Sequence, residues 1–156
     1  MRFGIIIGNF SPLHNGSLTL CKVVQTLSRK LLIMVVHSKK DTISVNIRVN
    51  WLKQEFPYAI IKNIPRKNAL PDISSIRSTI ALISQGLVSP EFHLYSSNNS
   101  AAKLATKLRI NFTILDPNRL AQNIMSEPLL IDPYKNWFNL PFSVRLSLIK
   151  RVVLIG

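Results

Sequence analysis

Cysteine is nearly absent from this sequence, since Cys21 is the single one among 156 residues. One thiol forms no internal disulfide and builds no thiolate metal cluster. Long apolar runs are missing too: the longest candidate, Leu31–Val36, is far shorter than the ~20 residues of a membrane helix. Asn9 and Pro12 interrupt the apolar start of the chain too early for a signal peptide. We therefore expect a cytoplasmic protein with no membrane segment.

Acidic residues are also scarce. The chain has 7 Asp and Glu against 20 Lys and Arg, which gives a formal net charge of +13. No two of these acids lie within four residues of each other, so the sequence offers no catalytic pair of neighbouring carboxylates. A basic surface of this kind attracts polyanions and phosphorylated small molecules. The length and the 47% apolar fraction indicate one domain with a full core.

Strand and helix patterns alternate along the chain. Such alternation predicts an α/β fold, namely a Rossmann-like, doubly wound five-stranded parallel sheet with helices on both faces. The predicted strands are Arg2–Gly8, Leu31–His37, Ala59–Ile64, Phe92–Ser96 and Asn111–Leu115. The predicted helices are Asn15–Ser28, Val45–Phe56, Ile73–Ile83 with Gly86 as its cap, and Ala101–Leu108.

Two local patterns lead to further expectations. Pro65–Asp72 is basic and bounded by prolines, which predicts a loop. The first helix is expected to turn Leu20, Val23, Val24 and Leu27 towards the core.

After the fifth strand the alternation fails, and the sequence predicts two short helices and one more strand: Asp132–Trp137, Pro141–Arg151 and Val152–Ile155.

The segment after the first strand is the most informative: Gly8-Asn9-Phe10-Ser11-Pro12-Leu13-His14-Asn15-Gly16-Ser17. Ligands of open parallel sheets bind beyond the carboxyl ends of the strands, at the switch in strand order. Gly8 permits close approach of a ligand and Pro12 stiffens the turn. His14 then precedes a helix whose first amides, near Gly16 and Ser17, are expected to be unpaired. This arrangement predicts an anion site, and the alternative is a tight turn with an incidental histidine.

The same segment resembles the first signature of the nucleotidylyltransferase superfamily, G-x-F-x-P-x-H-x-G-H. Gly8, Phe10, Pro12, His14 and Gly16 match, whereas Ser17 stands in place of the second histidine. Other segments are similar to the nicotinamide-nucleotide adenylyltransferase domain of the bacterial enzymes that also carry a ribosylnicotinamide kinase. These segments are Arg48-Val49-Asn50-Trp51-Leu52, Leu94-Tyr95-Ser96-Ser97, Ile114-Leu115-Asp116-Pro117-Asn118-Arg119, Asp132-Pro133-Tyr134-Lys135-Asn136-Trp137 and Lys150-Arg151-Val152-Val153-Leu154-Ile155-Gly156.

The resemblance implies the transfer of the adenylyl group of ATP to nicotinamide mononucleotide, which gives NAD and pyrophosphate. The attacking group is already a phosphate anion, so the site needs no general base. Alignment and positive charge around the phosphates are the requirements, and an acid-poor chain can meet them. Mg²⁺ is expected as the cofactor, held by the substrate phosphates and water and by no protein ligand.

His14 is the predicted catalytic residue, as a donor to the α-phosphate. Three nucleotide contacts have structural alternatives: Arg48 as a solvated helix charge, the Asp116 and Arg119 pair as parts of a turn, and Ser96 as a helix cap. The predicted nucleotide-binding residues are Gly8, Asn9, Phe10, Pro12, Gly16, Ser17, Arg48, Ser96, Asp116 and Arg119.

The sequence departs from the family pattern in three places. Ser17 offers a hydroxyl donor but no cationic form. Leu130 stands where the family has an arginine that binds the ATP phosphates. The stretch Pro71–Ile76, where the family stacks a tryptophan on the nicotinamide, contains no aromatic residue. These substitutions leave open whether the activity is intact or impaired.

Three functions therefore compete. The first is the adenylyltransferase, with ATP and nicotinamide mononucleotide as partners. The second is a noncatalytic relative that binds a nucleotide, or a remnant of the longer bifunctional enzyme. The third, a nucleic-acid-binding module suggested by the +13 charge, is disfavoured because no zinc, helix-turn-helix or RNA-binding signature is present.

The domain division follows from the same resemblance. Residues 1–150 are expected to form the adenylyltransferase domain, and residues 151–156 the remnant of the first strand of an absent kinase domain, because no P-loop follows. The oligomeric state stays open, a homo-oligomer included.

Overall fold

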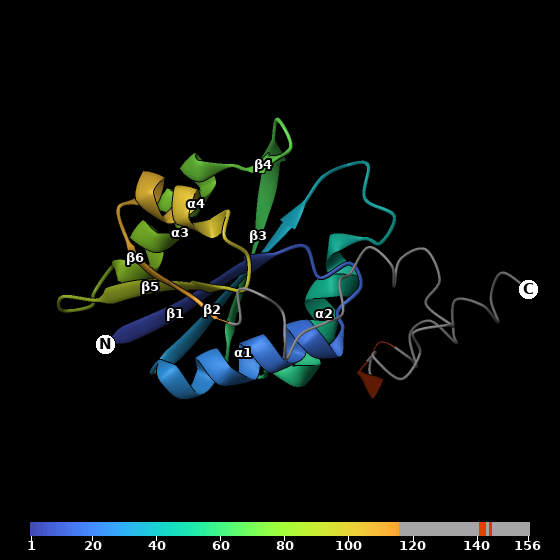
Figure 1. Ribbon diagram of the computed structural model, residues 1–156, viewed down its shortest axis with the longest axis horizontal. Coiled ribbons are helices and arrows are strands. Elements are labelled where there is room, and N and C mark those ends of the chain that lie inside the picture. Colours follow the sequence, from blue (N-terminus) through green and yellow to red (C-terminus); the bar gives the residue numbers. More distant parts are fainter. Residues whose placement is uncertain (116–140, 143, 145–156) are drawn as a thin grey trace, which may run out of the picture.

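The computed structural model describes residues 1–115, 141, 142 and 144 (Figure 1). The two short helices and the strand predicted after residue 131, and the predicted domain boundary at residue 150, therefore lie almost wholly outside the described residues. In chain order the elements are β1 (Arg2–Gly8), α1 (Asn15–Leu27), β2 (Lys30–His37), α2 (Val45–Glu55), β3 (Ile60–Lys67), β4 (Leu70–Pro71), α3 (Ile73–Ser84), β5 (Glu91–Ser96), α4 (Ala101–Leu108) and β6 (Asn111–Ile114).

The strands form one sheet in the order β4-β3-β2-β1-β5-β6. The run β3-β2-β1-β5-β6 is parallel, and β4 alone pairs antiparallel with β3. The predicted five-stranded parallel sheet is thus confirmed, with one short strand added at its edge. The order along the chain reverses between β1 and β5, and ligands of such sheets bind at the carboxyl ends of the strands beside this switch.

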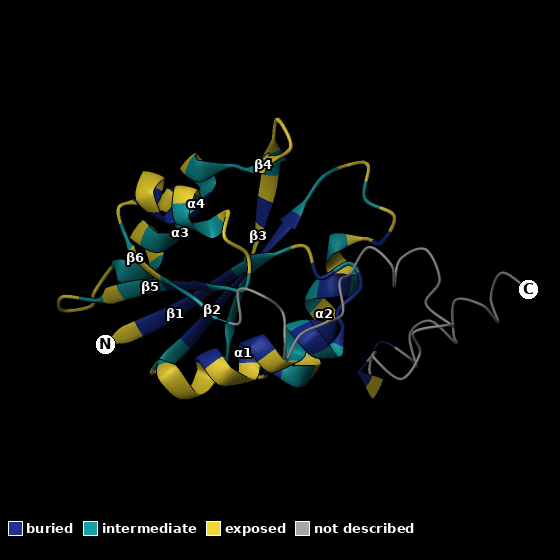
Figure 2. Cartoon of the chain, viewed as in Figure 1, coloured by how far each residue is buried: buried dark blue, intermediate teal, exposed yellow. Residues whose placement is uncertain are grey.

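Helices cover both faces of the sheet, with α1 and α2 on one side and α3 and α4 on the other (Figure 1). Successive strand residues serve opposite faces: Ile6 and Ile33 pack towards α1 and α2, whereas Ile5 and Leu32 pack towards α3 and α4. The central strands are buried from both sides, as Figure 2 shows. A sheet covered twice requires apolar residues at consecutive positions, which is why β1 and β2 are continuous apolar runs.

Side chains and backbone turns fix the ends of the helices. Ser44 accepts a hydrogen bond from the Asn46 amide at the start of α2, and Asp72 accepts one from Ser74 at the start of α3. After α3, Gly86 has a φ of 76°, so the predicted glycine cap is confirmed. None of the helices in the described part of the chain is long and apolar enough to cross a membrane.

Two local expectations are wrong. The segment Pro65–Asp72 is not a loop, because β3 continues to Lys67 and a hairpin turn leads into β4. Asn68 and Ala69 form that turn, with φ angles of 55° and 66°. Positive φ at both central residues is the signature of the two-residue turn that joins twisted antiparallel strands.

The buried face of α1 also differs from the prediction. Val23 and Leu27 are 41% and 46% exposed, while Gly16, Leu20, Cys21 and Val24 are buried. The buried stripe therefore runs through Cys21 rather than Val23. Burial raises the pKa of the Cys21 thiol to about 12, so this thiol stays protonated at neutral pH.

Gly4 sets the distance between β1 and α1. A Cβ at this position would lie 2.6 Å from Val24 Cγ1 and 2.6 Å from Ser28 Oγ. Valine is β-branched and stiff, and Ser28 Oγ already donates to the Val24 carbonyl oxygen at 2.7 Å. Neither neighbour can move without disturbing the end of α1.

We expect Gly4→Ala to lower the free energy of unfolding by about 1–3 kcal/mol, the typical cost of overpacking. Urea denaturation of the variant and of the parent measures the difference. Gly8→Ala is the matched control, because a Cβ at Gly8 meets the Phe10 ring at 3.4 Å, near ordinary contact distance. Equal stability of Gly4→Ala and the parent would show that α1 has room to shift.

His93, on β5, links Arg2 at the start of β1 to Thr113 on β6. Its Nδ1 lies 3.2 Å from an Arg2 guanidinium nitrogen, and its Nε2 lies 2.7 Å from Thr113 Oγ1. Because the guanidinium only donates, Nδ1 accepts and Nε2 carries the proton of a neutral ring. Desolvation by burial, together with the Arg2 charge, lowers the pKa of His93 below its ordinary value of 6.5.

A lowered histidine pKa means that the unfolded chain binds the proton more readily than the folded one. Stability is therefore expected to be complete above about pH 6.5 and to fall as the pH drops through the range below it. Thermal melts between pH 8 and pH 5 measure this loss, and His93→Gln should flatten the profile. An unchanged profile in His93→Gln would assign the pH dependence to other groups.

Candidate active site

A pocket of about 730 Å³ opens at the carboxyl ends of β1 and β5, beside the switch in strand order. Gly8 and Asn9 line it from the end of β1, and Ser96 lines it from the end of β5. The β4 hairpin and α4 supply further walls through residues such as Leu70 and Leu104. Pockets for small ligands typically measure roughly 300–1,000 Å³, so this one is large enough for a mononucleotide.

The charged residues that line the pocket in the described part of the chain are all cationic. They are Arg66 from β3 and Lys103 and Lys107 from α4. Among these described residues there is no Asp or Glu. A concave site with charges of one sign concentrates the electric field, so this pocket attracts anions.

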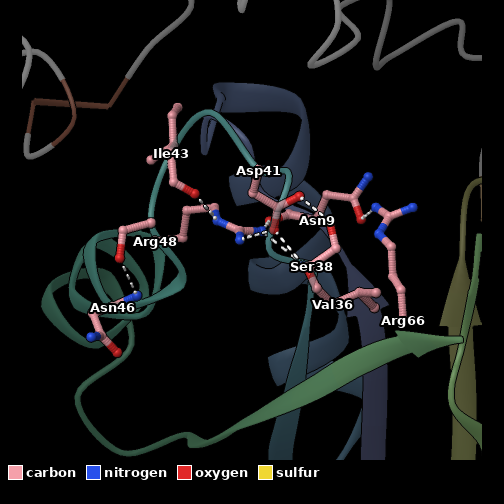
Figure 3. A network of polar contacts seen from close by, with 9 residues as sticks. Asn9, Val36, Ser38, Asp41, Ile43, Asn46, Arg48 and Arg66 are labelled. Carbon is pink, nitrogen blue, oxygen red and sulfur yellow. Dashed lines mark hydrogen bonds and ion pairs between the residues drawn. The ribbon is translucent and has the colours of Figure 1, made fainter.

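Arg66 is held over the end of β1. Its terminal nitrogen donates a hydrogen bond to Asn9 Oδ1, and Figure 3 shows the side chain reaching from β3 towards Asn9. The Nε of Arg66 is buried and has no hydrogen-bond acceptor within the described part of the chain. Burying a donor without an acceptor costs free energy. An anion bound here would supply the acceptor that the Arg66 Nε lacks.

His14 lies outside the pocket, at the start of α1. The ring is buried, and its Nδ1 accepts a hydrogen bond from the Ser17 amide at 3.2 Å. Its Nε2 lies 3.1 Å from Ser17 Oγ. Because Nδ1 accepts, Nε2 carries the ring proton and donates to Oγ. The hydroxyl hydrogen of Ser17 is then the donor that this pair presents.

This geometry corrects the expectation of bare amides behind His14. The imidazole itself caps the helix and occupies the Ser17 amide, because a helix start needs acceptors for its first N–H groups. Ser17, which replaces the second histidine of the family pattern, contacts both ring nitrogens, one through its amide and one through its hydroxyl. The two signature positions therefore act as one hydrogen-bonded unit.

Arg48 is not the solvated helix charge that was one of its two predicted roles, and it is not among the residues that line the pocket. Its side chain is 1% exposed, and its nitrogens donate to the carbonyl oxygens of Ile43, Asn9 and Val36 at 3.1, 2.7 and 2.9 Å. The remaining contact is an ion pair with Asp41 at 2.6 Å. Figure 3 shows these partners converging on one guanidinium. Arg48 thus positions the loops around the site, and its contact with a nucleotide stays a prediction.

The Asp41 carboxylate accepts hydrogen bonds from the Arg48 guanidinium and, at 2.8 Å, from the Ser38 amide. Burial by itself would raise the pKa of Asp41, but the Ser38 amide and the Arg48 charge together hold it below the usual value of 3.8. The ion pair therefore persists at neutral pH, and its contribution to stability is lost only as the pH falls through the lowered pKa.

The other predicted site residues fall into two groups. Gly8, Asn9 and Ser96 line the pocket. Pro12, His14, Gly16 and Ser17 lie at the start of α1, and Phe10 is buried beneath Gly8. Ser96 Oγ accepts from the Asn98 amide at 3.0 Å and so holds the turn before α4 rather than the helix itself. Asp116 and Arg119 lie outside the described residues.

No protein-family model matches the chain. The trifunctional NAD biosynthesis/regulator protein NadR of Salmonella typhimurium is 26% identical over 180 aligned residues, which cover 99% of this chain and 42% of that protein. This chain is similar in sequence to NadR. The resemblance predicted from the motifs is thereby confirmed, and the chain spans less than half the length of this relative.

Solved structures show the same fold. The crystal structure of a NadR protein in complex with NR has a TM-score of 0.67 at 17% identity, and the match covers 89% of this chain and 42% of that one. A bifunctional NMN adenylyltransferase/ADP ribose pyrophosphatase of Francisella tularensis, complexed with AMP and a manganese ion, has a TM-score of 0.67 at 13% identity, with 86% and 42% covered. The predicted Rossmann-like fold is therefore confirmed.

The three pocket cations were missed by sequence reasoning. Arg66 belongs to the segment that was expected to be a loop, and its basic character was the available signal. Lys103 and Lys107 are four residues apart on α4, a spacing that places both on one face of a helix. Which neighbours that face meets depends on how α4 packs on the sheet, and the local sequence does not contain this information.

We expect Arg48→Ala to lower the free energy of unfolding by about 3–5 kcal/mol, because it leaves Asp41 and several buried carbonyl groups without a partner. Guanidinium chloride denaturation measures the change. Lys53→Ala is the matched control, since Lys53 is an exposed cation on the same helix and its loss should cost less than about 0.5 kcal/mol. Equal losses in the two variants would contradict the structural role of Arg48.

Proposed function

We propose that this protein is a nucleotidyltransferase that transfers the adenylyl group of ATP to nicotinamide mononucleotide and releases NAD and pyrophosphate. One observation carries the proposal: the mononucleotide-sized pocket and the His14–Ser17 unit lie at the two ends of the same short β1–α1 connection, beside the switch in strand order. Two substrates bound on either side of this turn would have their phosphates next to each other. Structures of NadR in complex with NR, and with NAD and AMP-PNP, support this choice of ligands.

In this proposal the mononucleotide occupies the pocket with its phosphate towards Arg66 and Asn9. ATP lies over the start of α1, with its α-phosphate near the Ser17 hydroxyl and His14. A phosphate oxygen of the mononucleotide attacks the α-phosphorus, the bond to the bridging oxygen of the β-phosphate breaks, and pyrophosphate leaves. The nucleophile is already an anion, so the reaction needs no carboxylate base, and none lines the pocket among the described residues.

The role of the chain's own residues is alignment and charge stabilisation. Arg66 would hold the mononucleotide phosphate against Asn9, which itself is fixed through its carbonyl by Arg48. The His14–Ser17 pair would donate towards the charge that develops on the α-phosphate. Arg66 and the His14–Ser17 pair belong to elements that are packed into the core. Their positions are therefore set before the substrates bind.

Mg²⁺ is proposed as the metal, carried into the site by the phosphates of ATP. Within the described residues no group of three or more His, Cys, Asp or Glu is arranged to hold a metal ion. Mg²⁺ usually keeps several waters and binds through substrate phosphates, so a protein cage is not needed. When bound, it would neutralise part of the phosphate charge. We further propose that the reaction takes place in the cytoplasm.

A second function has support from the same site. The His14 ring is only 5% exposed and its nitrogens contact Ser17, an arrangement that a noncatalytic nucleotide-binding relative would also tolerate. The two functions differ in what they require from the ring. Transfer needs the imidazole that orients the Ser17 hydroxyl towards the phosphate, whereas binding alone needs only an intact start of α1.

The decisive experiment compares two substitutions of His14 in an assay for dinucleotide and pyrophosphate from ATP, Mg²⁺ and nicotinamide mononucleotide. His14→Asn keeps a good helix cap but removes the imidazole, so it should keep the parent's stability and lose transfer by about 10²-fold or more. His14→Ala removes the cap as well and should also lose about 1 kcal/mol of stability. Thermal melts report stability in parallel.

The outcomes separate the two functions. Product formed by the parent protein and lost in His14→Asn supports the transferase. Full turnover in His14→Asn would confine His14 to capping the helix. If the parent forms no product but ATP raises its melting temperature, the noncatalytic function holds instead.

A further inference from the structure

The outer surface of α3 and α4 is basic. Arg77 on α3, Lys103 and Lys107 on α4, and Arg109 directly after α4 are all exposed. Figure 2 shows exposed residues along the outer sides of both helices. Neither helix contains Asp or Glu, and within the described part of the chain none of the four cations forms an ion pair. No described carboxylate therefore offsets their charge.

The acid that stands closest in sequence to α3 is occupied. Asp72 precedes the helix, and its carboxylate accepts hydrogen bonds from the Ser74 amide at 3.3 Å and from the Ser75 hydroxyl at 2.9 Å. It acts as the cap of α3 and compensates the first turn of that helix. The positive charge further along α3 and on α4 is left to other partners.

A hydrogen bond shows that the cations of the two helices are neighbours. A terminal nitrogen of Arg77 donates to the Lys107 carbonyl oxygen at 2.7 Å, so the Arg77 side chain reaches from α3 to the last turn of α4. Lys103 and Lys107 are four residues apart and share one face of α4. Arg109 follows at the end of the same helix. These four residues form one surface, which we call the α3–α4 patch.

Hydroxyl groups accompany the cations. Ser74 and Ser78 on α3 and Thr106 on α4 are exposed. A hydroxyl oxygen donates one hydrogen bond and accepts others, so it can pair with phosphate oxygens and with sugar hydroxyls. Arg, Lys, Ser and Thr are the side chains that contact the phosphates and sugars of nucleic acids. The chemistry of this surface is therefore suited to a sugar–phosphate backbone.

The residues that these helices lack narrow the choice of partner. Neither α3 nor α4 contains an aromatic residue. Protein interfaces are enriched in aromatic side chains, and proteins that bind single strands stack the bases on them. Leu82 is the large apolar side chain that α3 exposes, and one such residue does not build an apolar interface. A duplex stacks its own bases and needs backbone contacts alone, so it fits best.

The shape of the surface favours RNA over DNA. Both helices lie against the sheet, because Ile76 and Ile80 of α3 and Ala105 and Leu108 of α4 pack into the core. A helix held in this way cannot enter the major groove of B-form DNA. The minor groove of an RNA duplex is wide and shallow, and it presents 2′-hydroxyl groups between its phosphates. A broad surface that carries cations and hydroxyls matches that groove.

We propose that the α3–α4 patch binds double-stranded RNA through its phosphates and 2′-hydroxyl groups, independently of base sequence. This binding is an activity beyond adenylyl transfer and does not depend on it. The chain contains no sequence signature of an RNA-binding protein, because the fold assembles the patch from two separate helices.

The test is fluorescence anisotropy of the full chain with a labelled RNA duplex of about 16 base pairs, the length that a double-stranded RNA-binding domain covers. Contacts from the four cations predict that the affinity falls about a hundredfold when the salt concentration rises from about 50 to about 200 mM. The first variant is Arg77→Gln/Arg109→Gln, which removes two cations that do not line the pocket. It should bind more weakly, and the same rise in salt should cost it only about tenfold.

A second variant and a matched control complete the design. Lys103→Gln/Lys107→Gln removes the other two cations and should show the same weaker salt dependence. The control, Lys22→Gln/Lys53→Gln, removes equal charge from exposed positions on α1 and α2, on the opposite side of the sheet. It should keep the salt dependence of the parent. Thermal melts show which variants remain folded.

Weaker binding in either patch variant, with the control unchanged, supports the inference. No binding of the RNA duplex, or an equal loss in the control, would overturn it. Equal or tighter binding of single-stranded RNA, of a DNA duplex of the same sequence, of polyglutamate or of anionic lipid vesicles would also overturn it, because the patch would then not select an RNA duplex. The product assay reports adenylyl transfer separately, so the two proposals stand or fall independently.

Discussion

The guanidinium of Arg48 ties together the loops at the carboxyl end of the sheet. It is buried in α2, and it donates to carbonyl groups from the β1–α1 turn, from β2 and from the β2–α2 loop. Asp41 balances its charge. A buried charge with all of these partners tolerates few other arrangements, because moving any one loop leaves a polar group unsatisfied. The positions of the turns around the site therefore depend on this one side chain.

Asn9 extends this constraint into the pocket. Its carbonyl oxygen accepts from Arg48 and its side-chain oxygen accepts from Arg66. One residue of the first turn thus connects a structural cation, which is buried, to a second cation that lines the ligand space. On the other side of the same turn, the His14–Ser17 unit begins α1. The proposed function places substrate recognition and phosphate chemistry on two sides of this single turn.

The low acid content affects the site in two ways. Within residues 1–115 the pocket cations have no ion-pair partners, so no described carboxylate offsets their charge. The ion pair in the described part of the chain joins Asp41 to Arg48, and it belongs to the buried network that supports the fold. A reaction whose nucleophile is already an anion suits such a chain, because it requires positive charge and alignment and no carboxylate base.

The sequence by itself determined the order of strands and helices along the chain and the position of the turn between β1 and α1, where an anion site is predicted. These features follow from local patterns: continuous apolar runs, helical spacing, and the residues Gly8 to Ser17 in one short stretch. The sequence did not predict the hairpin at Asn68 and Ala69, because neither residue is the glycine that usually marks such a turn.

Only the tertiary structure decided the roles of the cations. Arg48 and Asn9 are 39 residues apart in the sequence, and Arg66 and Asn9 are 57 residues apart. No local sequence pattern therefore predicts their hydrogen bonds. An arginine on a helix looks the same in sequence whether it faces water, a nucleotide or three carbonyl groups. Its role is fixed by the packing of α2 against the sheet, and the same holds for the lysines of α4.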